Sequence, residues 1–266
     1  MLKQRIITAV LLAPVVLLLI FYGNQWQFAA LVVLLQVMSG YEWLRMNRVP
    51  QVINVALNAS LALAVFIATL QDWLMLSFQS YLIILVLLWV PALMWLKNIR
   101  WGNNDAWGHM LKTAIGLLAI VFFAISLNTL HDQPNGHLWT LILFVLIWVA
   151  DTGAYISGKS FGRSKLAPAI SPGKTWEGLL GGVILVAIYA WFIATLMNIS
   201  AMYAVLSFPL VAVFSVAGDL CASLGKRQAG IKDSSNFLPG HGGFIDRFDS
   251  LIAAAPLFVI VLRLVS

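Results

Sequence analysis

Long apolar runs separated by short polar segments extend from one end of the chain to the other. Each run has about 20 residues, the number of helical residues that crosses a hydrocarbon core of roughly 30 Å. The pattern predicts an all-α fold, a polytopic membrane bundle of about nine helices. The predicted helices span residues 5–23, 26–46, 52–70, 77–97, 112–130, 138–158, 177–197, 202–222 and 248–265.

Composition agrees with a membrane protein, because 61% of the residues are hydrophobic, 10% are charged and the mean hydropathy is +0.92. Soluble domains expose far more polar surface. The single cysteine, Cys221, excludes an intrachain disulfide. The net charge of +6 does not indicate a nucleic-acid partner, because the basic residues are dispersed between apolar runs.

The basic residues alternate between the two sides of the predicted bundle. Fifteen of the 16 lysines and arginines flank the N-terminus and the even-numbered loops, and only Arg263 departs from this pattern. The odd-numbered loops, for example at Asn24 and Asn198, carry none. The positive-inside rule therefore predicts a cytoplasmic N-terminus and, for a bacterial-type inner membrane, functional loops at the cytoplasmic face.

The acidic residues lie mostly in the second half of the chain, where six of ten fall between positions 151 and 249. We expect one membrane domain, with residues 1–130 as a scaffold and residues 131–266 as a catalytic half that includes cytoplasmic loops 159–176 and 223–247. Within the scaffold helices, Glu42 is the only acid inside an apolar run. The two halves show no shared repeat of the kind that many transporters have.

The loop at 223–247 has the composition of a phosphate site. Its cations Lys226, Arg227 and Lys232 precede a turn that contains Gly240, Gly242 and Gly243. Glycines permit the positive φ angles of an anion-binding backbone nest, so the loop suits a triphosphate. The alternative is a basic cytoplasmic loop that merely contains a turn.

Carboxylates follow this loop at helical spacing. Asp246 and Asp249 are three residues apart and share one face of a helix, while Asp219 lies near the cytoplasmic end of the preceding helix. Three carboxylates beside phosphate-binding cations favour a Mg²⁺ site. In the alternative interpretation Asp246 pairs with Arg247 or Arg227 and Asp249 caps the helix.

Asp151 lies inside a predicted membrane helix, about 10 Å from its cytoplasmic end by helical rise. A carboxylate at the membrane centre costs about 2.5–3.5 kcal/mol on insertion scales, so Asp151 is expected to face the bundle interior and meet a partner. That partner belongs either to the functional site or to a structural hydrogen bond with a neighbouring helix.

The loop at 159–176 is also basic and glycine-rich. Its Gly173-Lys174-Thr175 sequence is not a P-loop, because Pro168 stands where that motif requires glycine. Ser171-Pro172 predicts a helix start near Lys174, which would turn backbone donors and the Lys174 ammonium toward a phosphate. The alternative is an anchor for anionic lipid headgroups. In the other loop, His241 between two glycines suits a general acid or a phosphate contact.

The loop and its flanks resemble the phosphatidate cytidylyltransferase (CDP-diacylglycerol synthase) family. The signature of that family is matched at its spacings by Ser223, Lys226-Arg227, Lys232-Asp233, residues 239–243, Asp246-Arg247 and Asp249. Resemblance extends through residues 150–155, 165–168, 171–175 and 218–219, which covers the C-terminal half of the chain. Gly225 departs from the family pattern, which usually has a larger apolar residue there.

The resemblance implies Mg²⁺-dependent transfer of a cytidylyl group from CTP to phosphatidic acid, with pyrophosphate leaving, by a membrane enzyme that forms a homodimer. The expected metal ligands are Asp219, Asp246 and Asp249. The expected phosphate contacts are Lys226, Arg227, Lys232 and Arg247, with His241, Gly242 and Gly243 in the triphosphate turn, and Asp151, Lys174 and Ser223 completing the substrate site.

Other functions stay open at this stage. A transporter or lipid carrier would use Asp151 and Asp219 as ion-coupling groups, but it would be expected to show related halves. Another enzyme acting on phosphorylated lipids, such as a lipid kinase or a CDP-alcohol phosphotransferase, would also need basic loops at the membrane surface. The Asp-Gly-x2-Ala-Arg start of the CDP-alcohol phosphotransferase motif is absent from the sequence.

Overall fold

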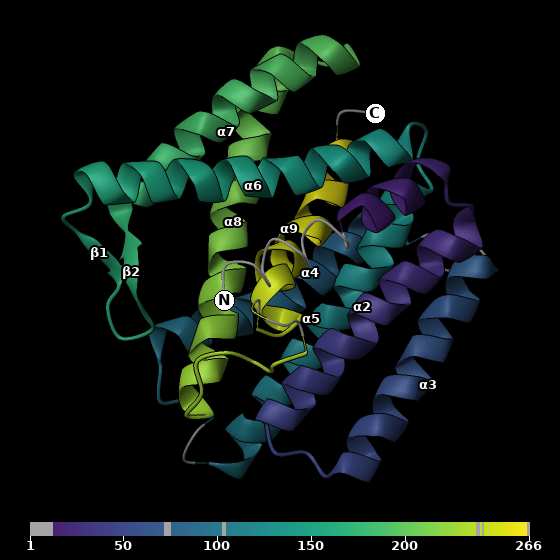
Figure 1. The fold of residues 1–266 in the computed structure, drawn as a ribbon, viewed down its shortest axis with the longest axis vertical. Helices are drawn as coiled ribbons and strands as arrows, with labels where there is room; N and C mark the ends of the chain where they lie inside the picture. The colour runs from purple at the N-terminus through teal and green to yellow at the C-terminus, as the bar shows by residue number, and fades with distance from the viewer. Residues whose placement is uncertain (1–12, 72–75, 103–104, 238–239, 241, 265–266) are drawn as a thin grey trace.

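A computed structural model describes residues 13–71, 76–102, 105–237, 240 and 242–264. Within this part of the chain, nine helices occupy the nine predicted apolar runs, so the all-α prediction is confirmed (Figure 1). A first helix is described over Ala13–Tyr22. The others are α2 (Gln25–Met46), α3 (Gln51–Leu70), α4 (Phe78–Lys97), α5 (Ala106–His131), α6 (Gly136–Phe161), α7 (Trp176–Met197), α8 (Ala201–Gln228) and α9 (Ile245–Arg263).

Seven of the described helices, α2 to α8, are long and apolar enough to cross a membrane. Helix α9 has 19 residues but carries charges at Asp246, Arg247, Asp249 and Arg263, so its length and composition alone do not mark it as a span. The outer helices expose apolar side chains, such as Leu63 of α3 and Ile188 of α7. Exposed apolar surface of this extent is typical of a multi-pass membrane protein.

Helix α9 lies at the centre of the bundle, where it contacts α2, α4, α5, α6 and α8 (Figure 1). Ala253, Ala254 and Ala255 are fully buried, and the Phe258 ring fills the space one turn later. Small side chains let neighbouring helices approach closely, which substitutes for a hydrophobic driving force in lipid. The first turn of α9, which carries predicted site residues, is therefore held by helices from both halves of the chain.

Several helix ends meet at the end of the bundle where α8 terminates. The Lys112 ammonium at the start of α5 donates to Gln228 Oε1 at 2.7 Å, and Gln228 Nε2 donates to the Ile99 carbonyl at 2.8 Å. His109 lies 3.0 Å from the carbonyl of Asn47, which follows α2. These contacts fix the loops at this end relative to one another.

A helix starts two residues after Lys174, as predicted, but Ser171-Pro172 does not begin it. Residues Lys165–Ala167 (β1) and Ser171–Thr175 (β2) form an antiparallel hairpin, and α7 begins only at Trp176. Trp176 N donates to the Ser164 carbonyl at 2.9 Å, and the Glu177 carboxylate accepts from Ser164 N at 3.0 Å. Ser171-Pro172 indicates a helix start only from local sequence, whereas β2 forms by pairing with β1, which precedes it in the chain.

Candidate active site

Close packing of α8 against α9 brings two predicted site carboxylates together. A Cβ atom added to Gly218 would lie 2.6 Å from the Asp249 carbonyl oxygen, so this position requires glycine. The next residue, Asp219, therefore stands beside the second turn of α9, and its carboxylate interacts electrostatically with that of Asp249. Two acidic side chains from different helices consequently share one region of the site.

The β-hairpin delivers a cation to this region. Lys174 Nζ in β2 forms an ion pair with Asp219 Oδ2 at 2.5 Å, with both side chains about three-quarters buried. Ser223, one turn further along α8, donates its hydroxyl to Asp219 Oδ1 at 3.2 Å. The structure thus brings Lys174, Asp219 and Ser223 together, although the hairpin rather than a helix N-terminus positions the lysine.

A second ion pair links the end of α8 to the start of α9. Lys226 Nζ donates to Asp246 Oδ1 at 2.6 Å, and the side chains are only 10% and 8% exposed. Asp246 Oδ2 accepts from the backbone N–H groups of Ser234 and Gly243, both at 2.9 Å. Burial alone would raise the pKa of Asp246, but the hydrogen bonds from Lys226, Gly243 and Ser234 hold that pKa below its ordinary value.

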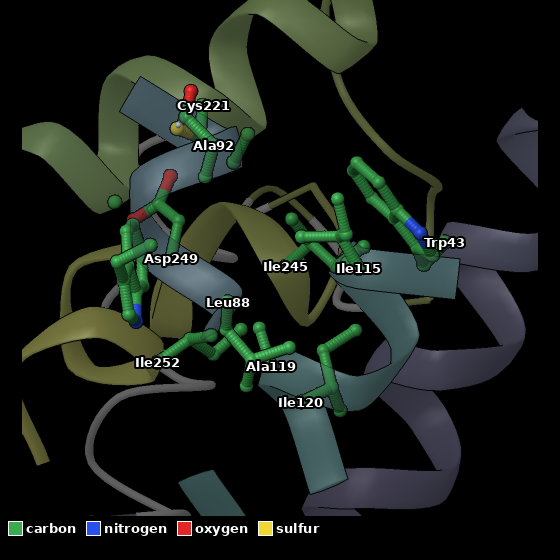
Figure 2. Close-up of a pocket in the computed structure, with 14 residues that line it drawn as sticks. Trp43, Leu88, Ala92, Ile115, Ala119, Ile120, Cys221, Ile245, Asp249 and Ile252 are labelled. Atoms are coloured by element: carbon green, nitrogen blue, oxygen red, sulfur yellow. Dashed lines mark hydrogen bonds between the residues drawn. The ribbon is translucent and has the colours of Figure 1, made fainter. Parts of the chain in front are cut away.

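Asp249 lies at the edge of a small cavity between α2, α4, α5, α8 and α9 (Figure 2). The cavity has a volume of about 60 Å³ and is otherwise lined mainly by apolar side chains, with Trp43 on the opposite side from Asp249 in Figure 2. Asp249 Oδ1 accepts from Ser250 N at 2.8 Å, and the carboxylate also interacts with Lys226. Asp249 therefore does not cap α9, which begins one turn earlier at Ile245.

The fit of a metal ion differs among the three predicted ligands. Among the described residues, no group of three His, Cys, Asp or Glu side chains is arranged to hold a metal ion. Asp246 is occupied by Lys226 and two backbone donors. Asp219 and Asp249 are neighbours, and Mg²⁺ commonly uses one or two carboxylates together with substrate phosphates. Asp219 is also occupied, by Lys174 and the Ser223 hydroxyl, so its proximity to Asp249 alone favours these two carboxylates as the ligands. The three-ligand assignment stays a prediction.

The remaining predicted phosphate contacts among the described cations, Arg227, Lys232 and Arg247, are exposed. Arg227 donates to the Ile170 carbonyl at 3.4 Å and to the Ile231 carbonyl at 3.3 Å, so it joins the hairpin to the loop. Gly242 has a φ angle of +81°, as the nest prediction requires, and a Cβ there would lie 2.7 Å from Asp246 Oδ2. His241 lies outside the described residues.

Asp151 differs from expectation in its surroundings. Its side chain is exposed on α6 and, in the part of the chain that the structure describes, it accepts no hydrogen bond. It nevertheless interacts electrostatically with Asp219 and Lys174. The residue is therefore exposed rather than interior in this single chain, because α6 and α7 form a pair at the periphery of the bundle (Figure 1). The expected partners are present as Asp219 and Lys174, and a role in the site stays a prediction.

Glu42 of α2 is a site neighbour that the sequence interpretation assigned to the scaffold. Its side chain is fully buried, and its two oxygens accept from Ser234, Ser235, Phe244 and Ile245 at 2.5–2.9 Å. One signal in the sequence pointed to it, since it is the only acid inside an apolar run of the first five predicted helices. A buried charge of this kind needs a specific partner, and here the partners lie beside the predicted phosphate turn.

Comparisons with known proteins point to one family. The family model described as the cytidylyltransferase family matches residues 3–265. The chain is 34% identical to the phosphatidate cytidylyltransferase of Haemophilus influenzae, with 97% of each chain covered. It is 36% identical to that of Pseudomonas aeruginosa, with 98% of this chain and 97% of the relative covered, and 34% identical to that of Bacillus subtilis, with 99% and 98% covered.

Proposed function

The chain belongs to the cytidylyltransferase family, and on that premise we propose how it acts as a phosphatidate cytidylyltransferase. It transfers the cytidylyl group of CTP to phosphatidic acid, which gives CDP-diacylglycerol and pyrophosphate. The observation that carries the assignment is the pair of lysine–carboxylate contacts, Lys174–Asp219 and Lys226–Asp246, at one end of a membrane bundle. That combination supplies fixed cations where a polyphosphate and a lipid headgroup can meet.

In this reaction a phosphate oxygen of phosphatidic acid attacks the α-phosphorus of CTP, a P–O bond forms, and the bond to pyrophosphate breaks. The nucleophile is already an anion, so the protein has to position it and neutralise charge rather than remove a proton. Lys226 is oriented by Asp246 and faces the charge that develops on the phosphates. Lys174, held by Asp219, contributes a second cation from the hairpin.

The glycine-rich turn and the exposed cations complete the proposed CTP site. Gly242 offers a backbone N–H group, and Gly243, whose own N–H is bound to Asp246, shapes the turn. Arg227 at the end of α8, Lys232 in the loop and Arg247 in the first turn of α9 are exposed. Ser223 positions Asp219, and His241 and Asp151 are proposed to contact substrate.

Mg²⁺ would be held by Asp219 and Asp249 together with the substrate phosphates, and when bound it supplies charge neutralisation for the transferring group. This assignment leaves Asp246 to orient Lys226, to which it is bound together with two backbone donors, and it requires Lys174 to release Asp219 when the ion and the substrate bind. Asp219 and Asp249 lie close enough to interact, whereas Asp246 is bound to Lys226, Ser234 and Gly243.

We further propose that the site faces the cytoplasm from a bacterial-type inner membrane, with the N-terminus on the same side, because the basic residues alternate as the positive-inside rule requires. A homodimer follows from the resemblance to the family. No nucleic-acid partner is needed. The transporter alternative is not favoured, since the relatives matched over nearly the whole chain are named as cytidylyltransferases.

The proposed function is tested with the purified protein in lipid or detergent, supplied with CTP, phosphatidic acid and Mg²⁺. Liponucleotide and pyrophosphate should appear in equal amounts, and omission of phosphatidic acid should stop both. Absence of liponucleotide under conditions where the protein remains folded would contradict the assignment.

A further inference from the structure

The loop between α8 and α9 is tied to the N-terminal half of the chain through one side chain. Glu42 lies in the last two turns of α2, about 190 to 200 residues away in sequence from its partners, and is fully buried. Its Oε1 accepts from Ser235 Oγ at 2.5 Å and from Phe244 N at 2.9 Å. Its Oε2 accepts from Ser234 Oγ at 2.7 Å and from Ile245 N at 2.9 Å.

These partners come from both ends of the glycine-rich segment. Ser234 and Ser235 precede it, whereas Phe244 and Ile245 follow it and begin α9. The N-terminus of α9 has no cap from a side chain of its own cap residue, Phe244. Glu42 therefore satisfies backbone donors that would otherwise remain unpaired in a buried position, and it holds the two ends of the segment together.

Hydrogen bonds also connect Glu42, through Ser234 and Asp246, to the proposed catalytic cation Lys226. Ser234 N donates to Asp246 Oδ2 at 2.9 Å, and Asp246 Oδ1 accepts from Lys226 Nζ at 2.6 Å. A displacement of Ser234 would therefore move the carboxylate that orients Lys226. Glu42 does not itself approach Lys226, so its effect on that cation passes through Ser234 and Asp246.

The glycine at position 243 is explained by the same carboxylate. A Cβ atom added to Gly243 would lie 2.5 Å from Glu42 Oε2 and would also collide with the Ser234 hydroxyl. The absence of a side chain thus lets the backbone of the turn reach Glu42. A carboxylate has acceptor capacity for all four donors, which an amide lacks, since one of its two polar atoms is itself a donor.

We propose that Glu42 is a positioning residue for the nucleotide, which sets the geometry of the triphosphate turn and, through Ser234 and Asp246, the orientation of Lys226. The proposal rests on the proposed function of the loop as the CTP site. It assigns a specific role to a helix of the predicted scaffold, so the N-terminal half takes part in substrate positioning as well as in packing.

The test compares Glu42→Gln with the parent and with Ser39→Ala as a matched control. Ser39 is also fully buried in α2, one turn before Glu42, and its hydroxyl has no hydrogen-bond partner among the described residues. Glu42→Gln keeps the size of the side chain but sets an amide donor against backbone and hydroxyl donors. Loss of charge-assisted hydrogen bonds should lower kcat/KM for CTP roughly ten- to hundredfold, with a clear rise in KM for CTP.

Two measurements separate positioning from a loss of folded protein. A smaller folded fraction lowers the apparent kcat and leaves the KM for CTP unchanged, whereas a misplaced turn raises the KM. Amide hydrogen exchange of Phe244 and Ile245, followed without substrate, should be at least about tenfold faster in Glu42→Gln than in Ser39→Ala. Ser235→Ala, which removes one donor and leaves the carboxylate in place, should change both quantities in the same direction by about two- to tenfold.

The exchange measurement keeps this proposal distinct from the proposed function. A parent protein without cytidylyltransfer activity would contradict the proposed function. Faster exchange in Glu42→Gln would still show that Glu42 holds the backbone of Phe244 and Ile245. An active parent whose KM for CTP and whose exchange at Phe244 and Ile245 are the same in Glu42→Gln would overturn the positioning role. If Glu42→Gln does not fold, unchanged values in Ser235→Ala would overturn it equally.

Discussion

Replacement of Asp246 by asparagine removes one partner of the buried Lys226–Asp246 ion pair. The side chains are 10% and 8% exposed, and their oxygen and nitrogen lie 2.6 Å apart. The amide can still accept from the backbone of Ser234 or Gly243, but it leaves the Lys226 ammonium without its countercharge. Breaking a buried pair on one side costs about 3–5 kcal/mol, so Asp246→Asn should be destabilised by about that much and should lose most of its activity.

A double-mutant cycle with Lys226→Met isolates the pair. Unfolding free energies of the parent, both single variants and the double variant are measured under one set of detergent conditions. The double variant should be more stable than the sum of the single changes predicts, with a coupling energy of about 1.5–3 kcal/mol, while remaining inactive. Additive effects within about 0.5 kcal/mol would refute the interpretation of this contact as an energetically coupled pair.

The same pair predicts a pH dependence with a defined sign. In the folded protein the pKa of Asp246 is held below its ordinary value by the surrounding donors. Its contribution to stability is therefore complete above the unfolded aspartate pKa of about 3.9 and is lost as the pH falls through the lower folded value. Acidification below about pH 4 should cost the parent more unfolding free energy than it costs Asp246→Asn. Equal losses would contradict this linkage.

Three further expectations follow from other parts of the site. Arg227→Lys keeps the charge but loses the planar guanidinium, so kcat/KM should fall roughly ten- to hundredfold, while the control Arg48→Lys should leave kcat/KM unchanged. Equal and small effects at both positions would mean that Arg227 serves only as a positive charge on the cytoplasmic side. Gly218→Ala forces a Cβ against α9 and should cost about 1–3 kcal/mol with loss of activity; parent-like values would contradict close helix packing there. A reporter fused after Lys232 should be cytoplasmic and one near Asn135 periplasmic, and both on one side would exclude the proposed topology.

The helices were predictable from the sequence because apolar runs of this length are stable in lipid only as helices. The hairpin was not, because Lys165–Ala167 and Ser171–Thr175 are too short to show a strand pattern and their pairing depends on contacts with Glu177 and Trp176. Hydrophobic periodicity reports on one segment by itself, whereas each strand of the hairpin forms only by pairing with the other strand.

The sequence predicted which residues belong to the site more fully than how they are arranged in space. Residue types and spacing brought Asp219, Lys226 and Asp246 into one prediction, and the structure places them at one end of the bundle. Spacing did not distinguish a carboxylate that orients a lysine from one that holds a metal ion, because that depends on the position of Lys226 relative to the first turn of α9. Glu42 was noted as an isolated acid, but its partners almost 200 residues away could not be inferred from a local pattern.

The central claim, cytidylyl transfer to a phospholipid, is tested most directly by following the phosphorus atoms of CTP. Purified protein with phosphatidic acid is supplied in parallel with CTP labelled at the α-phosphorus and CTP labelled at the γ-phosphorus. The α label should enter the lipid fraction and the γ label should appear only in pyrophosphate. Transfer of the γ label to lipid would indicate a lipid kinase, and retention of both labels in CTP would contradict the account.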